Sequence, residues 1–245
     1  MRMRRTSSLG ALAALGVLLA SSAALAYVLP ADYLLKLLLE KRHELKLDDL
    51  SVQLNVEDIA AGTNYDEHLF LKRPGRGRRL QEGDAALLYV ESEGARAVGT
   101  DQALKRLKGP PTDLTTLFFA PPREKFIETS LAWLANLGID TTVTALGREA
   151  DRTVYIIGAR PWEPDTPQLW LNKGSFLPVR LLAAVKENGT TVLHETRWLE
   201  YGSAAAGNWF PRVIEEYRAG VLARRAEVVQ VKTNQKLPES LFQLP

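Results

Sequence analysis

Hydrophobic and polar residues alternate through much of the chain, most clearly in Ser51–Glu57. There Val52, Leu54 and Val56 fall on one side of an extended chain, and polar residues fall on the other. A period of two is typical of an antiparallel strand with one buried face. Similar short runs bounded by turn residues predict further strands near His68–Arg73, Arg78–Gln81, Ala86–Glu91, Arg96–Thr100, Thr141–Leu146, Thr153–Ile157, Gln168–Asn172, Val179–Val185, Thr191–Tyr201, Trp209–Tyr217 and Val221–Lys232.

So many short strands predict one long antiparallel sheet. Asn188-Gly189 is a strong signal for a tight hairpin within it. A sheet of this length must curl into a barrel or fold over as a sandwich. The sequence therefore predicts a mainly β (α+β) fold and leaves these two forms open.

Two segments have the wider apolar spacing of a helix. Pro30–Leu47 begins with a proline that suits the first helical position, and Leu34, Leu38 and Leu45 belong to its broad apolar stripe. The second helix is expected over Arg123–Leu137, ending before Gly138. A short helical turn is also expected over Asp101–Lys108.

Two helices are too few to cover the inner face of such a sheet. An incomplete barrel would therefore keep a partly filled apolar cavity, which suits an acyl chain. A closed sandwich with a filled core is the alternative.

The first 26 residues have the pattern of a secretory signal peptide. Arg2, Arg4 and Arg5 precede the apolar run Leu9–Ala20, and Ala24-Leu25-Ala26 places small residues before Tyr27. The apolar run is short for a membrane span, although an uncleaved N-terminal anchor is the alternative. We expect residues 27–245 to form a single exported domain, located in the periplasm. Without Cys, it cannot carry a lipid on that residue.

Composition gives little support to catalysis or nucleic-acid binding. The chain of 245 residues is 46% hydrophobic and 24% charged, which is ordinary for a globular protein. Its formal charge of +2 depends on three N-terminal arginines, without which 28 basic residues face 29 acidic ones. None of the three His residues has metal-ligand spacing, and nucleophile-elbow, Walker and dinucleotide motifs are missing. We expect no enzyme activity, no metal, no cofactor and no nucleic-acid partner.

Several segments occur in an order that resembles a known family. They are Leu69-Phe70-Leu71-Lys72-Arg73-Pro74-Gly75, Gln168–Asn172 with Phe176–Arg180, Asn208-Trp209-Phe210-Pro211-Arg212, and the tail Val228–Leu237 followed by Leu241-Phe242. From about Ala31 to Phe242, the chain resembles the LolA-type outer-membrane lipoprotein carriers, and more closely the branch called outer membrane lipoprotein-sorting proteins.

This resemblance implies a half-barrel of about eleven strands, with helices as a lid over a hydrophobic cavity. Such carriers hold the acyl chains of lipoproteins, receive them from an inner-membrane ABC-type transporter and pass them to an outer-membrane acceptor. Arg73 matches the family arginine that bonds to the lid. The longer middle region and the Gly109–Pro122 stretch depart from the family pattern, so phospholipid is also a candidate cargo.

The resemblance and the apolar pattern together give the candidate lid and lipid-binding residues. They are Arg73, Leu34, Leu38, Leu45, Phe118, Trp133, Trp170, Phe176 and Trp198. Plain core packing is the alternative for the aromatic residues, and a solvated hairpin flank is the alternative for the basic run Lys72, Arg73, Arg76, Arg78 and Arg79. We predict a monomeric carrier. A lipid-sensing or interaction module of an envelope regulatory system and a structural part of an export complex are the alternatives.

Overall fold

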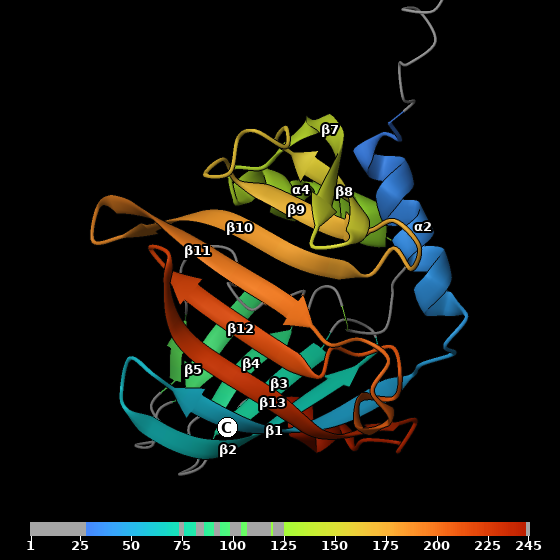
Figure 1. The fold of residues 1–245 in the computed structure, drawn as a ribbon. Coiled ribbons are helices and arrows are strands. Elements are labelled where there is room, and N and C mark those ends of the chain that lie inside the picture. Colours follow the sequence, from blue (N-terminus) through green and yellow to red (C-terminus); the bar gives the residue numbers. More distant parts are fainter. Residues whose placement is uncertain are drawn as a thin grey trace, which may run out of the picture.

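The computed structural model describes residues 28–73, 76–81, 86–90, 94–98, 104–106, 119 and 125–243. Its strands form one antiparallel sheet of thirteen, in the order β6-β5-β4-β3-β2-β1-β13-β12-β11-β10-β9-β8-β7. The sheet curls without closing (Figure 1). Its two edge strands are β6 and β7. The strands are β1 (Asp49–Asp58), β2 (Thr63–Lys72), β3 (Arg76–Gln81), β4 (Ala86–Val90), β5 (Gly94–Val98), β6 (Leu104–Arg106), β7 (Asp140–Glu149), β8 (Arg152–Gly158), β9 (Gln168–Asn172), β10 (Pro178–Glu187), β11 (Thr190–Leu199), β12 (Val213–Arg218) and β13 (Val221–Thr233).

The predicted mainly β, open half-barrel is confirmed, with thirteen strands in place of about eleven. One local prediction is wrong: Leu104–Arg106, within the expected helical turn, is strand β6. It pairs with β5 through Arg96↔Arg106, Ala97↔Lys105 and Val98↔Leu104. Pairing with a neighbouring strand decides the conformation of such a short segment, because its local preference is weak.

Both predicted helices form, with shifted ends. Helix α2 (Ala31–His43) starts after Pro30 and stops before Leu45, where Lys46 adopts a positive φ of 48°. Helix α4 (Phe126–Asn136) ends at a left-handed Gly138 with φ of 80°. The N–H of Ile139 then bonds to the carbonyl of Leu134, which is a common way to end a helix at glycine.

The main core lies on one face of the sheet, here called the inner face. It carries Val52, Leu54 and Val56 of β1, the alternating residues predicted to be buried. Leu34 and Leu38 of α2 belong to the same core cluster. Helices α2 and α4 lie together against one end of the curled sheet (Figure 1).

The opposite face, here called the outer face, has a smaller apolar cluster over β8 and β10, with Ala145 of β7 and Trp170 of β9 packed against it. Val154, Ile156, Ala159 and Val179 form it. The sheet is therefore apolar on both faces at this edge. Charged and polar side chains are common on the rest of the outer face, although Leu182 of β10 and Val213 of β12 are buried there.

Candidate functional site

The candidate binding surface is the inner face beneath the two helices. Arg42, near the end of α2, is buried with its guanidinium carbon 5.4 Å from the centre of the Phe126 ring on α4. Burial lowers the pKa of Arg42 to about 9. The two helices thus meet through an arginine and an aromatic ring rather than through leucines alone.

The three predicted leucines all contribute to this region. Leu34 and Leu38 are fully buried on α2. Leu45 lies beyond the end of α2, half-buried against the same core. In the observed conformation these side chains fill the inner face at the helix end, where sequence reasoning expects a partly filled cavity.

Three of the predicted aromatic residues lie with them. Trp198 of β11 is buried with its ring centre 6.2 Å from that of Phe119. Phe176 stacks on Tyr155 of β8 at 6.1 Å between ring centres. Trp133 of α4 is half-buried against the core. The structure brings these residues into one core, and their role in lipid binding stays a prediction.

Trp170 does not join that group. Its neighbours Leu169 and Leu171 point into the main core, so Trp170 lies on the outer face. There its Nε1 donates to Oε1 of Gln168 at 2.7 Å, and the guanidinium of Arg180 lies 4.8 Å from its ring centre. Phe118 is outside the described residues.

Sequence reasoning missed two aromatic residues of the core, Phe119 and Phe210. Their ring centres are 4.7 Å apart, and both are buried. Phe210 belongs to the Asn208–Arg212 motif, which offered a signal. Phe119 directly follows Phe118, which is a predicted site residue, so the sequence points to this region but to the neighbouring phenylalanine.

Arg73 lies exposed just after β2. Its backbone N–H donates to the carbonyl of Asp48 at 3.0 Å, in the segment leading from α2 to β1. Its own carbonyl accepts a bond of 2.9 Å from Arg76. Within the described part of the chain, the Arg73 side chain makes no hydrogen bond or ion pair, so its role at a lid stays a prediction.

Three other residues of the basic run bind the C-terminal segment, residues 234–243. Lys72 forms an ion pair with Glu239 at 2.8 Å, and Arg76 pairs with the same carboxylate. Arg78 donates to the carbonyl of Leu241 at 2.9 Å. These three basic residues therefore have protein partners and are not simply a solvated hairpin flank.

A group of charged side chains occupies the far part of the inner face. The Glu67 carboxylate accepts two bonds of 2.9 Å from Arg224 and lies 3.2 Å from Nε of Arg79. Glu216 accepts a bond of 2.9 Å from the other terminal nitrogen of Arg224. Sequence reasoning missed this group, although Glu67 is in phase with the inward-facing Leu69 and Leu71.

The outer face carries a polar row across seven neighbouring strands. In register from β9 to β2, the row is Trp170, Arg180, Arg197, Glu215, Arg225, Glu57 and Asn64. Glu195 bridges the two adjacent arginines, with Oε1 2.8 Å from Nε of Arg180. Opposite charges on neighbouring strands stabilise such a surface.

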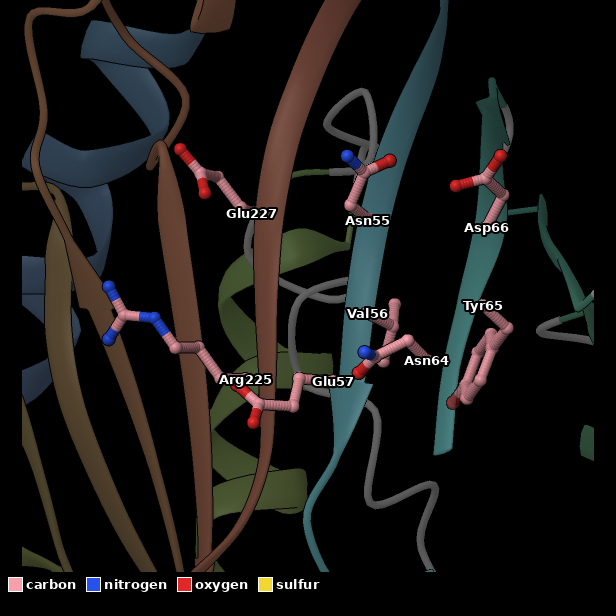
Figure 2. A pocket seen from close by; sticks show the side chains of 8 residues that line it. All are labelled: Asn55, Val56, Glu57, Asn64, Tyr65, Asp66, Arg225 and Glu227. Atoms are coloured by element: carbon pink, nitrogen blue, oxygen red, sulfur yellow. The ribbon is translucent and has the colours of Figure 1, made fainter. Parts of the chain in front are cut away.

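A pocket of about 630 Å³ lies over β1, β2 and β13 on this outer face. Figure 2 shows the residues that line it. Asn55, Glu57, Asn64, Asp66, Arg225 and Glu227 face outward, and Val56 and Tyr65 lie between them with side chains that pack with the main core. Most of them are polar or charged. This pocket is therefore unsuited to an acyl chain and differs from the predicted apolar cavity.

Within the described ranges, no three His, Asp or Glu side chains are placed to hold a metal ion. His194 lies 2.7 Å from Glu187, whose other oxygen pairs with Arg218. No helix of the described residues has the length and apolar character needed to cross a membrane.

Comparison with known proteins supports the fold. No family model matches the chain, and no curated protein matches it significantly. A crystal structure of a DUF1329-family protein from Desulfovibrio piger superposes with a TM-score of 0.58 at 10% identity, over 87% of this chain and 97% of that one. A LolA-superfamily protein from Nitrosomonas europaea superposes with a TM-score of 0.54 at 15% identity, over 88% and 98%. The chain therefore has a LolA-like open half-barrel fold.

Proposed function

We propose that this protein is a periplasmic carrier of lipid, binding the acyl chains of lipoproteins or phospholipid on the inner face of the half-barrel. The observation that carries the proposal is that two helices, rather than a second sheet, cover this apolar face. The LolA-like fold supports it. The signal-like pattern of residues 1–26 supports export.

The helices would act as a lid in this mechanism. Leu34, Leu35 and Leu38 are fully buried against the inner face, so an acyl chain must displace them to reach it. Each buried methylene contributes about 0.8 kcal/mol, and each leucine contributes a similar free energy per unit of area. Exchanging leucine contacts for acyl contacts is therefore nearly neutral in free energy. A carrier needs this balance because it must also release its cargo.

The proposed cargo route has a donor and an acceptor. An inner-membrane ABC-type complex would load the carrier, and an outer-membrane acceptor would receive the lipid. Arg73 lies beside the segment that follows α2, so a contact between this arginine and the lid could change the position of the helix. We infer that Arg73 takes part in opening or release.

A lipid-binding measurement tests the proposal. The full chain is expressed with residues 1–26, purified from the periplasm without detergent, and examined by native mass spectrometry with lipid extraction. We expect a stoichiometric lipid or acylated peptide, or uptake of a fluorescent fatty-acyl probe by empty protein. An empty mass without probe uptake would contradict a carrier and favour the interaction module.

Two valines provide a matched pair for locating the site. Val185 of β10 is half-buried against the main core, whereas Val221 is 68% exposed at the start of β13. Val185→Asn places an amide on the inner face and should weaken probe binding by about tenfold. Val221→Asn should leave it unchanged. Equal effects of the two substitutions would place the lipid elsewhere.

A further inference from the structure

Glu67, Arg79, Arg224 and Glu216 form a connected group of ion pairs that crosses the inner face of the curled sheet. Arg224 belongs to β13 and Glu67 to β2, and β1 lies between these strands. Arg79 of β3 and Glu216 of β12 extend the group on either side. On a flat sheet, strands two apart are separated by almost 10 Å, roughly the reach of an arginine side chain. The curl of the sheet brings these groups together on its concave side.

The charged group borders directly on the apolar core. Glu67 is opposite Leu54 in the pairing of β1 with β2, and Arg79 is opposite Leu69. Arg224 precedes Ala226 by two residues on the same strand face. The inner face is thus apolar at the helix end and charged immediately beyond it. This arrangement matches a ligand that has an apolar chain and a charged head group.

The four members differ in their contact with water. The exposed fractions of the side chains are 1% for Glu67, 10% for Arg224 and 13% for Arg79, but 36% for Glu216. Glu67 is held by both arginines. Glu216 is the member that water reaches most easily, so it is the carboxylate that an incoming anion can replace at the lowest cost in free energy.

Arg224 has capacity for such an anion. Two bonds go to Glu67 and one to Glu216, and Tyr65 is a further side-chain hydrogen-bond partner, while the Nε of Arg224 is buried without a hydrogen-bond partner. Burial alone would lower the pKa of Arg224, but the carboxylates of Glu216 and Glu67 raise it above its ordinary value. The guanidinium therefore stays charged. Planar guanidinium groups bind carboxylate and phosphate oxygens well.

We propose that Arg224 and Arg79 bind the anionic head group of an amphiphile, a carboxylate or phosphate that replaces the Glu216 carboxylate. The acyl chain would lie along the adjoining apolar face, so this inference rests on the proposed carrier function. It narrows the cargo to single- or double-chain lipids with an acidic head group. Glu216 would occupy the site when no cargo is bound.

The test compares two ligands with the same chain length and different charge. Binding of oleate and of uncharged oleyl alcohol is measured on the lipid-free full-length protein by displacement of a fluorescent acyl probe. Glu216→Gln removes the competing carboxylate, and we expect it to bind oleate about tenfold more tightly, with oleyl alcohol unchanged. Because Glu216 is partly exposed, this substitution should preserve the fold.

Glu227→Gln is the matched control. Glu227 lies on the outer face of β13, where it pairs with Arg212 at 2.6 Å. It should change neither affinity. Equal changes for oleate and oleyl alcohol in Glu216→Gln, or no change for either, would overturn the head-group site while leaving the carrier proposal intact.

Two further measurements distinguish the carrier proposal from the head-group proposal and an amphiphile from a free anion. Failure of both ligands to bind the wild-type protein would reject the carrier proposal and this inference with it. Inorganic phosphate tests whether the site takes a free anion. If phosphate binds Glu216→Gln as tightly as oleate does, the acyl chain contributes nothing and an amphiphile is excluded.

Discussion

The carboxylate of Asp49 on β1 accepts a hydrogen bond of 3.1 Å from the backbone N–H of Leu237, which follows it by 188 residues. The other carboxylate oxygen accepts a bond of 2.7 Å from the N–H of Gln235. Asp49 is buried, so water cannot replace these two bonds. One acidic side chain therefore fixes the C-terminal segment beside the first strand.

Asp49→Ala should lower the free energy of unfolding by about 1–3 kcal/mol, because two buried backbone N–H groups lose their acceptor. Asp48→Ala is the control, because the Asp48 side chain is exposed and this residue bonds to the same region only through its backbone groups. We expect the control to stay within about 0.5 kcal/mol of the wild type. Urea unfolding checks both, and equal losses would show that Asp49 has no special role.

Phe242→Ala tests whether the C-terminal segment is part of the stable fold. Phe242 is buried, with the guanidinium carbon of Arg76 5.5 Å from its ring centre. Its removal should cost about 3 kcal/mol and expose the segment to carboxypeptidase. Gln243→Ala, at an exposed neighbour, should change neither property. Unaltered resistance of Phe242→Ala to digestion would contradict the anchoring role.

Glu149 of β7 gives a pH-dependent prediction. Burial raises its pKa, although Arg197 and Arg180 partly oppose the shift. A raised pKa means that the folded state favours the protonated acid. The stability this provides is fully present below the pKa of the unfolded chain and is lost as pH rises through the folded-state pKa.

Glu149→Gln should therefore be more stable than the wild type at pH 7. The difference should shrink as pH falls through the raised folded-state pKa, and it should be lost below about 4, the ordinary pKa of an unfolded glutamate. Thermal unfolding across this range measures it. Glu200→Gln, at an exposed acid, serves as the control. A Glu149→Gln variant that is less stable at pH 7 would show that the arginines outweigh the burial.

Arg73→Leu tests the release step of the proposed carrier. If Arg73 helps to govern the lid, the variant should take up an acyl probe normally but transfer it to acceptor vesicles or acceptor protein about tenfold more slowly, the effect expected if the arginine makes one hydrogen bond to the lid during release. Arg152→Leu, at an exposed arginine of β8, is the control. Unchanged transfer would remove Arg73 from the mechanism, and an equal loss of stability in both variants would point to a general surface effect.

Local patterns in the sequence predicted most of the elements correctly. The alternation in Ser51–Glu57 is found in β1, and Asn188-Gly189 forms its hairpin with positive φ at both residues. Leu34 and Leu38 are buried as the helical stripe requires. These features depend on the period of a helix or strand and on the backbone freedom of glycine, which are properties of a few consecutive residues.

The orientation of single residues in a strand required the fold. The sequence makes Trp170 a candidate lipid-binding residue beside the other aromatics, yet Leu169 and Leu171 take the inner positions on β9. A strand that is apolar on both faces carries no alternation from which to choose a side. The side is decided by register with β8 and β10, including an irregularity between Pro178 and Arg180.

The sequence by itself determined the mainly β class, the two helices and the apolar stripes that make one sheet face and the helices pack together. Only the tertiary structure placed Glu67 and Arg224 in contact across β1, and only it gave Lys72 and Arg76 their partner Glu239. The reason is that the spacing of apolar residues along a helix or strand indicates only which face of that element is buried. The pairing of charges 157 or more residues apart depends on how the sheet curls and which strands become neighbours.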